Sequence, residues 1–108
     1  MDKETRKKLV EKYADEGGVA FLDLPRGAGT IAFKCPKQAD YERFQDKFAR
    51  NKGQSAAMRE LVLCSMVYPE DKIAGGDLLK RFPAAYEPIV VKLQEMAGSE
   101  VSIELKAE

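Results

Sequence analysis

The chain has 108 residues, of which 44% are hydrophobic and 33% are charged, so it can bury one modest core and is not disordered throughout. Its 18 basic and 18 acidic side chains cancel, and this balance argues against a nucleic-acid partner, which would call for a basic surface. A chain without net charge also lacks repulsion between its copies, so the sequence allows a homo-oligomer.

The first segment, Asp2–Glu16, predicts a helix, because Leu9, Val10 and Tyr13 fall on one narrow apolar stripe. Gly17-Gly18 is expected to end it. No apolar run follows the N-terminal charges, so we expect no secretory signal and a protein that stays in the cytoplasm.

Two short runs rich in Val, Ile and Phe come next, Val19–Leu24 and Thr30–Cys35. The Pro and Gly residues of Pro25–Gly29 between them predict a β-hairpin. A phosphate-binding loop would need Gly-Lys-Ser/Thr leading into a helix, whereas this loop leads into a strand. We therefore interpret it as the hairpin turn.

A pair of helices is predicted in the middle of the chain. Lys37–Asn51 carries Tyr41, Phe44 and Phe48 at helical spacing, and we expect these aromatic side chains to face the core. The following helix, 54–68, is apolar almost all round its axis, as expected of an element packed on every side. It is too short to cross a bilayer, so we predict that it forms the centre of the fold, antiparallel to its neighbour, and expect no membrane partner.

Tyr68-Pro69 is expected to end the central helix, because proline disfavours the helical conformation in the residue before it. Further along, Pro88 is expected either to delay the start of the last helix or to bend it. The last part of the chain predicts, in order, a turn at Glu70–Ala74, a break at Gly75-Gly76, a helix at Leu78–Phe82 capped by Asp77, a helix at Ala84–Met96, and a strand at Val101–Leu105.

These segments predict an α+β fold that is mostly helical. About four to five helices surround the central helix (54–68), beside a small antiparallel β-hairpin to which the C-terminal strand could add. We expect one domain over residues 1–108, with its core in residues 19–106 and a loosely docked helix at residues 1–16.

The residue types argue against an enzyme. The sequence has no histidine, which excludes Ser-His-Asp and Cys-His nucleophiles, and two cysteines alone leave a structural zinc site half empty. We expect no catalytic residue, no metal and no cofactor. Cys35 and Cys64 could form one bridge, but Cys64 lies in the apolar central helix, where a free Cys behaves as a small hydrophobe. We therefore expect reduced thiols, which is consistent with a cytosolic protein.

From Ile31 to Gly98, the order of landmarks resembles small tail assembly chaperones of long-tailed bacteriophages and prophages. Those proteins show a strand ending in proline, a helix with an aromatic pair, a helix running into an apolar-Pro-acidic corner, a short leucine helix, and a last helix ending in Gly. The matching residues are Ile31-Ala32-Phe33-Lys34-Cys35-Pro36, Tyr41, Phe44, Leu61, Cys64, Val67-Tyr68-Pro69-Glu70-Asp71, Leu78-Leu79, Phe82-Pro83, Ile89, Leu93 and Ala97-Gly98.

The resemblance implies a non-enzymatic protein of the host cytoplasm that coats the helical, aggregation-prone tape measure protein and helps to recruit tail tube subunits. Such a chaperone needs apolar grooves for partner helices. The candidate groove residues are large, apolar and close to chain breaks: Phe21, Leu24, Tyr68, Leu78, Leu79 and Phe82.

Two other classes of function stay open at this stage. The first is an adaptor or inhibitor, encoded by a phage or mobile element, that binds one folded host protein. The second is a small enzyme or nucleic-acid binder, which the missing histidine and the neutral charge disfavour.

Overall fold

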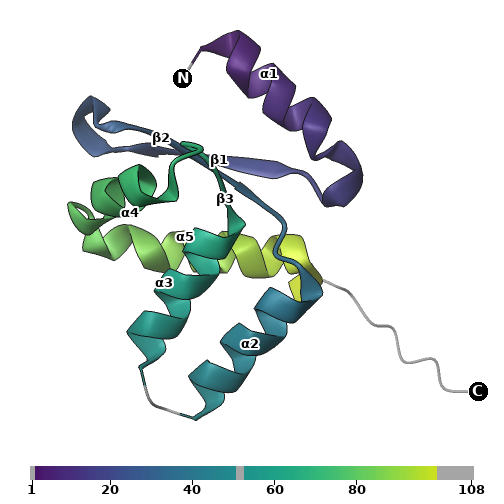
Figure 1. Ribbon diagram of the computed structural model, residues 1–108, viewed down its shortest axis with the longest axis vertical. Coiled ribbons are helices and arrows are strands. Elements are labelled where there is room, and N and C mark those ends of the chain that lie inside the picture. The colour runs from purple at the N-terminus through teal and green to yellow at the C-terminus, as the bar shows by residue number, and fades with distance from the viewer. Residues whose placement is uncertain (1, 51–52, 100–108) are drawn as a thin grey trace, which may run out of the picture.

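The computed structural model of the chain describes residues 2–50 and 53–99, and in this part the fold is α+β and mostly helical (Figure 1). The predicted fold class is confirmed. None of the described helices combines the length and the apolarity needed to span a membrane. In chain order, the elements are α1 (Lys3–Lys12), β1 (Val19–Leu24), β2 (Gly29–Lys34), α2 (Gln38–Ala49), α3 (Gln54–Ser65), β3 (Met66–Tyr68), α4 (Lys72–Lys80) and α5 (Tyr86–Gln94).

The predicted helix at Asp2–Glu16 is shorter in the structure, because a 3₁₀ turn at Ala14–Glu16 follows α1. Asp2 caps α1 by accepting, at Oδ1, a hydrogen bond of 2.7 Å from the Thr5 amide. No residue of α1 is buried. Figure 1 shows α1 on one side of the hairpin and the other helices on the opposite side.

The sheet has three antiparallel strands in the order β1-β2-β3, so β1 and β3 form its edges. The hairpin of β1 and β2 is the one predicted. β3 pairs with β2 through Tyr68 opposite Ala32 and Met66 opposite Phe33, with a register shift between the two pairs.

The prediction that the central helix continues to residue 68 is wrong for Met66–Tyr68, which form β3. A strand at this place satisfies backbone groups along β2 that would otherwise have no partner there. Val67 suits a strand because β-branched side chains pack well on a pleated surface. The third strand predicted from sequence, Val101–Leu105, lies outside the described residues.

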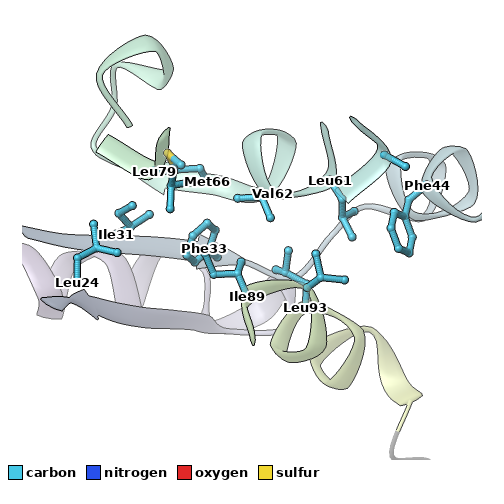
Figure 2. Packing of buried hydrophobic residues seen from close by; sticks show 12 residues of the cluster. Leu24, Ile31, Phe33, Phe44, Leu61, Val62, Met66, Leu79, Ile89 and Leu93 are labelled. Carbon is cyan, nitrogen blue, oxygen red and sulfur yellow. The ribbon is translucent and has the colours of Figure 1, made fainter. Parts of the chain in front are cut away.

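One buried cluster joins the sheet to α2, α3, α4 and α5 (Figure 2). Ile31 of β2, Leu61 of α3, Leu79 of α4 and Leu93 of α5 meet in it, each no more than 1% exposed. α3 packs against α2, α4, α5 and β2. This position explains why its apolar side chains point nearly all round its axis. Ser65, at the end of α3, is also buried, and its hydroxyl has no hydrogen-bond partner within residues 2–50 and 53–99.

The predicted break at Gly75-Gly76 is wrong, because α4 runs through both glycines. Asp71, and not Asp77, caps the helix. Its Oδ1 accepts hydrogen bonds from the amides of Ile73 at 2.9 Å and Ala74 at 3.4 Å. The first turn of α4 is thereby stabilised enough to include the residues that we predicted as an isolated turn.

Gly75 is buried where α4 crosses close to β3. A Cβ atom at this position would clash with Sδ of Met66, and it would lie 3.4 Å from Cγ of Pro69. At Gly76 a Cβ would meet only Cδ2 of Leu63, at 3.6 Å. The first glycine therefore permits a close helix–strand approach, and neither glycine ends the helix.

The predicted helix at Ala84–Met96 is confirmed as α5, with a 3₁₀ turn at Pro83–Ala85 before it and a π turn at Glu95–Ser99 after it. Pro88 lies in the first turn of α5, where its missing N–H breaks no hydrogen bond of the helix.

Candidate functional site

The structure separates the six predicted groove residues by their burial. Leu24, at the end of β1, is 4% exposed, and Leu79, on the inner side of α4, is 0% exposed. Both belong to the same buried cluster (Figure 2). Neither side chain is accessible to a partner, so the prediction is corrected for these two residues: they stabilise the core.

Phe21 and Tyr68 are half-buried and lie on separate strands. The guanidinium of Arg6 in α1 lies 4.6 Å from the centre of the Phe21 ring, a cation–π distance. Arg6 also approaches Asp23, at 3.9 Å from Nη2 to Oδ1. A charged helix therefore covers one face of the Phe21 ring.

Leu78 and Phe82 are half-buried at the end of α4 and pack against the core. The guanidinium carbons of Arg26 and Arg81 lie 5.9 and 5.8 Å from the centre of the Phe82 ring. Two cations therefore flank the Phe82 ring. The predicted residues thus do not assemble into one groove.

An open apolar groove lies elsewhere, between α5 and the antiparallel pair α2 and α3. It consists of two hollows of about 320 and 400 Å³, which adjoin because both are lined by Met58 and Glu87. We call the two hollows together the α5 groove. Its other lining residues are Phe44, Phe48, Val90, Val91 and Gln94 in the smaller hollow and Ser55, Arg59, Pro83, Ala84 and Tyr86 in the larger.

Two large apolar side chains in this groove are exposed to solvent. Phe48 is 40% exposed and Val91 is 53% exposed, whereas most large apolar side chains of the described residues are buried or half-buried. Beneath them, Phe44 is buried, with its ring centre 5.5 Å from that of Phe48. The prediction that Tyr41, Phe44 and Phe48 all form core is therefore right for Phe44, while Tyr41 is half-buried and Phe48 lines the groove.

Ion pairs hold α2 against α3 near the groove. Glu60 of α3 binds Arg43, at 3.4 Å from Nη1 to Oε1, and also binds Lys47 through Oε2. The hydrogen bond from Lys47, followed by that from Arg43, outweighs desolvation and lowers the pKa of Glu60 below its usual range. These ion pairs link the two helices that carry Phe48 and Met58.

The chemistry of the groove is that of a binding surface. Glu87 and Arg59 supply charges of both signs beside apolar side chains. Residues 2–50 and 53–99 contain no group of three or more His, Cys, Asp or Glu side chains that could hold a metal. Cys35 and Cys64 are both unpaired.

One sequence signal pointed to the groove. Ile89, Val90 and Val91 are consecutive, and at about 100° per residue their side chains point to different sides of the helix. One core-facing side of the helix cannot bury all three. Ile89 and Val90 face the core, and Val91 is left exposed.

Comparisons with known proteins give a fold and a family without an assigned activity. Residues 26–106 match the model of a family described as a domain of unknown function, DUF6848. The uncharacterised protein rbstp2171 from Bacillus stearothermophilus has a similar structure, with a TM-score of 0.66 and 24% sequence identity over 89% of this chain and 97% of that chain. This likeness shows the fold alone.

Among curated proteins, the chain is similar to ribosomal RNA large subunit methyltransferase M of Actinobacillus pleuropneumoniae. Identity over 98 residues is 28% for the enzyme of serotype 5b (strain L20) and 26% for that of serotype 3 (strain JL03). The matches cover 89% of this chain, and the chain spans only 23% and 24% of the length of those enzymes.

Proposed function

We propose that this chain, which belongs to the DUF6848 family of domains of unknown function, is a non-enzymatic chaperone that binds apolar stripes of partner helices in its α5 groove. The observation that carries the proposal is the exposure of Phe48 and Val91 over one open apolar groove. Exposed apolar side chains gathered in one place are typical of interaction sites.

A helix is the partner element that suits this surface. In helix-in-groove recognition, apolar side chains at helical spacing enter a groove between helices, and polar residues flank them. Phe48 and Val91 come from different walls of the groove, with Met58 half-buried between the two hollows. Glu87 and Arg59 are placed to pair with the charged flanks of an amphipathic helix.

The resemblance to phage tail assembly chaperones supplies the identity of that partner. It implies the tape measure protein, a long helical protein whose apolar stripes need cover before the tail tube surrounds it, and tail tube subunits as further partners. The site of action is then the cytoplasm of the infected or lysogenic host. A modest groove on a small domain suits many weak, repeated contacts along one long helix, which can be released later.

The likeness to the methyltransferases does not lead us to assign their activity here. The chain spans about a quarter of the length of those enzymes, so the likeness concerns only that part of them. Binding to RNA also calls for an excess of Lys and Arg, and this chain has 18 basic and 18 acidic residues. Ribosomal RNA is therefore a weaker candidate than a helical protein.

The test is co-expression with the tape measure protein of the same phage or prophage. The wild-type chain should keep that protein soluble and co-purify in several copies per partner. Phe48→Glu combined with Val91→Glu places two charges in the groove and should abolish solubilisation, while circular dichroism stays native-like. Val10→Glu combined with Ile73→Glu is the matched control, because these two large apolar side chains are also exposed and lie outside the groove.

Equal solubility of the tape measure protein with and without the chain would refute the chaperone function. If the groove variant and the control variant solubilised equally well, the α5 groove would not be the binding site. A one-to-one complex with a folded host protein, lost in the groove variant, would instead establish the adaptor function.

A further inference from the structure

A hollow of about 340 Å³ lies beside β3 and shares no lining residue with the α5 groove. Three lysines line it: Lys12, the last residue of α1, Lys34, the last residue of β2, and Lys72, the first residue of α4. We call it the lysine hollow. Its three cations are far apart in the sequence, so it is the fold that gathers them at one place.

The charges of these lysines are not neutralised by the part of the chain that the structure describes. Within residues 2–50 and 53–99, none of the three forms an ion pair, whereas Lys8, Lys47, Lys80 and Lys92 each do. Glu70 also lines the hollow, so three positive charges and one negative charge leave an excess of two positive charges. Because like charges at one place repel each other, an anion bound among them would be stabilised.

The rest of the lining is aromatic and apolar. Tyr13 is half-buried, and Nζ of Lys12 lies 5.5 Å from the centre of its ring, a cation–π distance. The remaining wall consists of Leu9, Cys64, Met66 and Val67. An anion beside such a wall is less screened by water than one on an open surface, which strengthens its attraction to the lysines. The hollow therefore combines a cationic rim with an apolar wall.

We infer that the lysine hollow binds a small organic phosphate monoester, with the phosphate among the three ammonium groups and the apolar part of the ligand against the wall. A phosphate monoester carries a charge of about −1.5 to −2 at pH 7, which matches the excess of two positive charges. Lysine binds phosphate as a point charge, so it needs no bidentate geometry.

The size of the hollow favours a small molecule over a polymer. Its volume is close to the lower end of the range for ligand pockets, about 300–1,000 Å³. A nucleic acid carries one negative charge per phosphate along its whole length, and its binding needs many cations in a row. The inference does not depend on the proposed function of the α5 groove.

The test is an NMR titration of the full-length chain with phenyl phosphate at low salt. Amides of the residues that line the hollow should shift saturably, and inorganic phosphate and benzenesulfonate should bind more weakly, because the first lacks the apolar part and the second carries one charge. Lys12→Gln combined with Lys72→Gln should weaken binding of phenyl phosphate by about fivefold or more. Lys7→Gln combined with Lys37→Gln is the matched control, because it removes two exposed lysines that do not line the hollow. It should leave the affinity nearly unchanged.

Shifts that do not saturate, or that spread over the surface without reaching the hollow, would overturn the inference. So would equal losses of affinity in the two double variants, which would reflect the total charge of the chain and not a site. If a short single-stranded DNA bound more tightly than phenyl phosphate at the same salt concentration, and the Lys12 and Lys72 variant lost that binding, the hollow would belong to a nucleic-acid surface instead.

Discussion

Replacing Gly75 by Ala adds one methyl group at the contact between α4 and β3. Taken alone, the change should favour the helix by about 0.5–1 kcal/mol, because Gly loses more conformational freedom than Ala on folding. The added Cβ, however, would clash with Sδ of Met66 and lie 3.1 Å from its Cε, and Met66 is only 2% exposed. Overpacking of this kind costs about 1–3 kcal/mol. We therefore expect Gly75→Ala to destabilise the chain by up to about 2 kcal/mol.

Gly76→Ala is the matched control, because it adds the same methyl group one residue later in the same helix. Its Cβ would make an ordinary contact of 3.6 Å with Leu63, so there is no cost of overpacking. Only the advantage of Ala over Gly in a helix remains, and we expect stabilisation by about 0.5–1 kcal/mol. The two variants should differ by about 1–3 kcal/mol in urea melts. In thermal melts, each kcal/mol corresponds to about 4–8 °C for a domain of this size.

Equal and favourable effects of the two substitutions would refute the close approach of α4 to β3. Equal and negligible effects would favour the break at Gly75-Gly76 that the sequence predicts, since glycines in a loop gain little from a helix former.

Five further substitutions test other parts of the structure. Leu61→Ala should cost about 2–5 kcal/mol in urea melts, because Leu61 is buried at the centre of the core, whereas exposed Arg59→Ala should cost about 0.5 kcal/mol or less. Ser65→Ala should leave stability unchanged or raise it by about 1 kcal/mol, since it removes a buried hydroxyl without a partner among the described residues. Glu60→Gln should cost about 0.2–1 kcal/mol at pH 7. Because the folded-state pKa of Glu60 is lowered, that difference from wild type should shrink as the pH falls below the ordinary value of 4.5. Cys35→Ser should keep the fold and the activity, since a hydroxyl can donate to the same carbonyl, and purified wild-type protein should contain no stoichiometric zinc by elemental analysis.

Local sequence patterns predicted those elements whose signals lie within the elements themselves. The hairpin needed only two β-type runs and the Pro25–Gly29 turn, and α2 needed only its aromatic spacing. The elements that were mispredicted depend on distant partners. Met66–Tyr68 is a strand because its backbone pairs with that of β2. Gly75 lies in a helix that packs closely against Met66 of β3. Neither partner can be recognised from residues next to these positions in the sequence.

The candidate site was harder to predict for a related reason. A helix that is apolar on one face shows which side chains can be buried, but not where the covering neighbour ends. Phe44 and Phe48 differ by one helical turn and have the same side chain, yet α5 and α3 cover the first and leave the second open. Leu79 was likewise predicted as accessible because it lies near chain breaks, although the core surrounds it completely.

α3 passes into β3 without an intervening residue, since Ser65 is the last helical residue and Met66 the first of the strand. Because no loop separates the helix from the strand, a displacement of one is expected to move the other. Met58 of α3 lines the α5 groove, and at the other end of the connection β3 pairs with β2 through Met66 and Tyr68, with Met66 buried in the core. If a partner in the groove displaces α3, we therefore expect β3 to shift with it. Hydrogen exchange at the β3 amides would report such a shift.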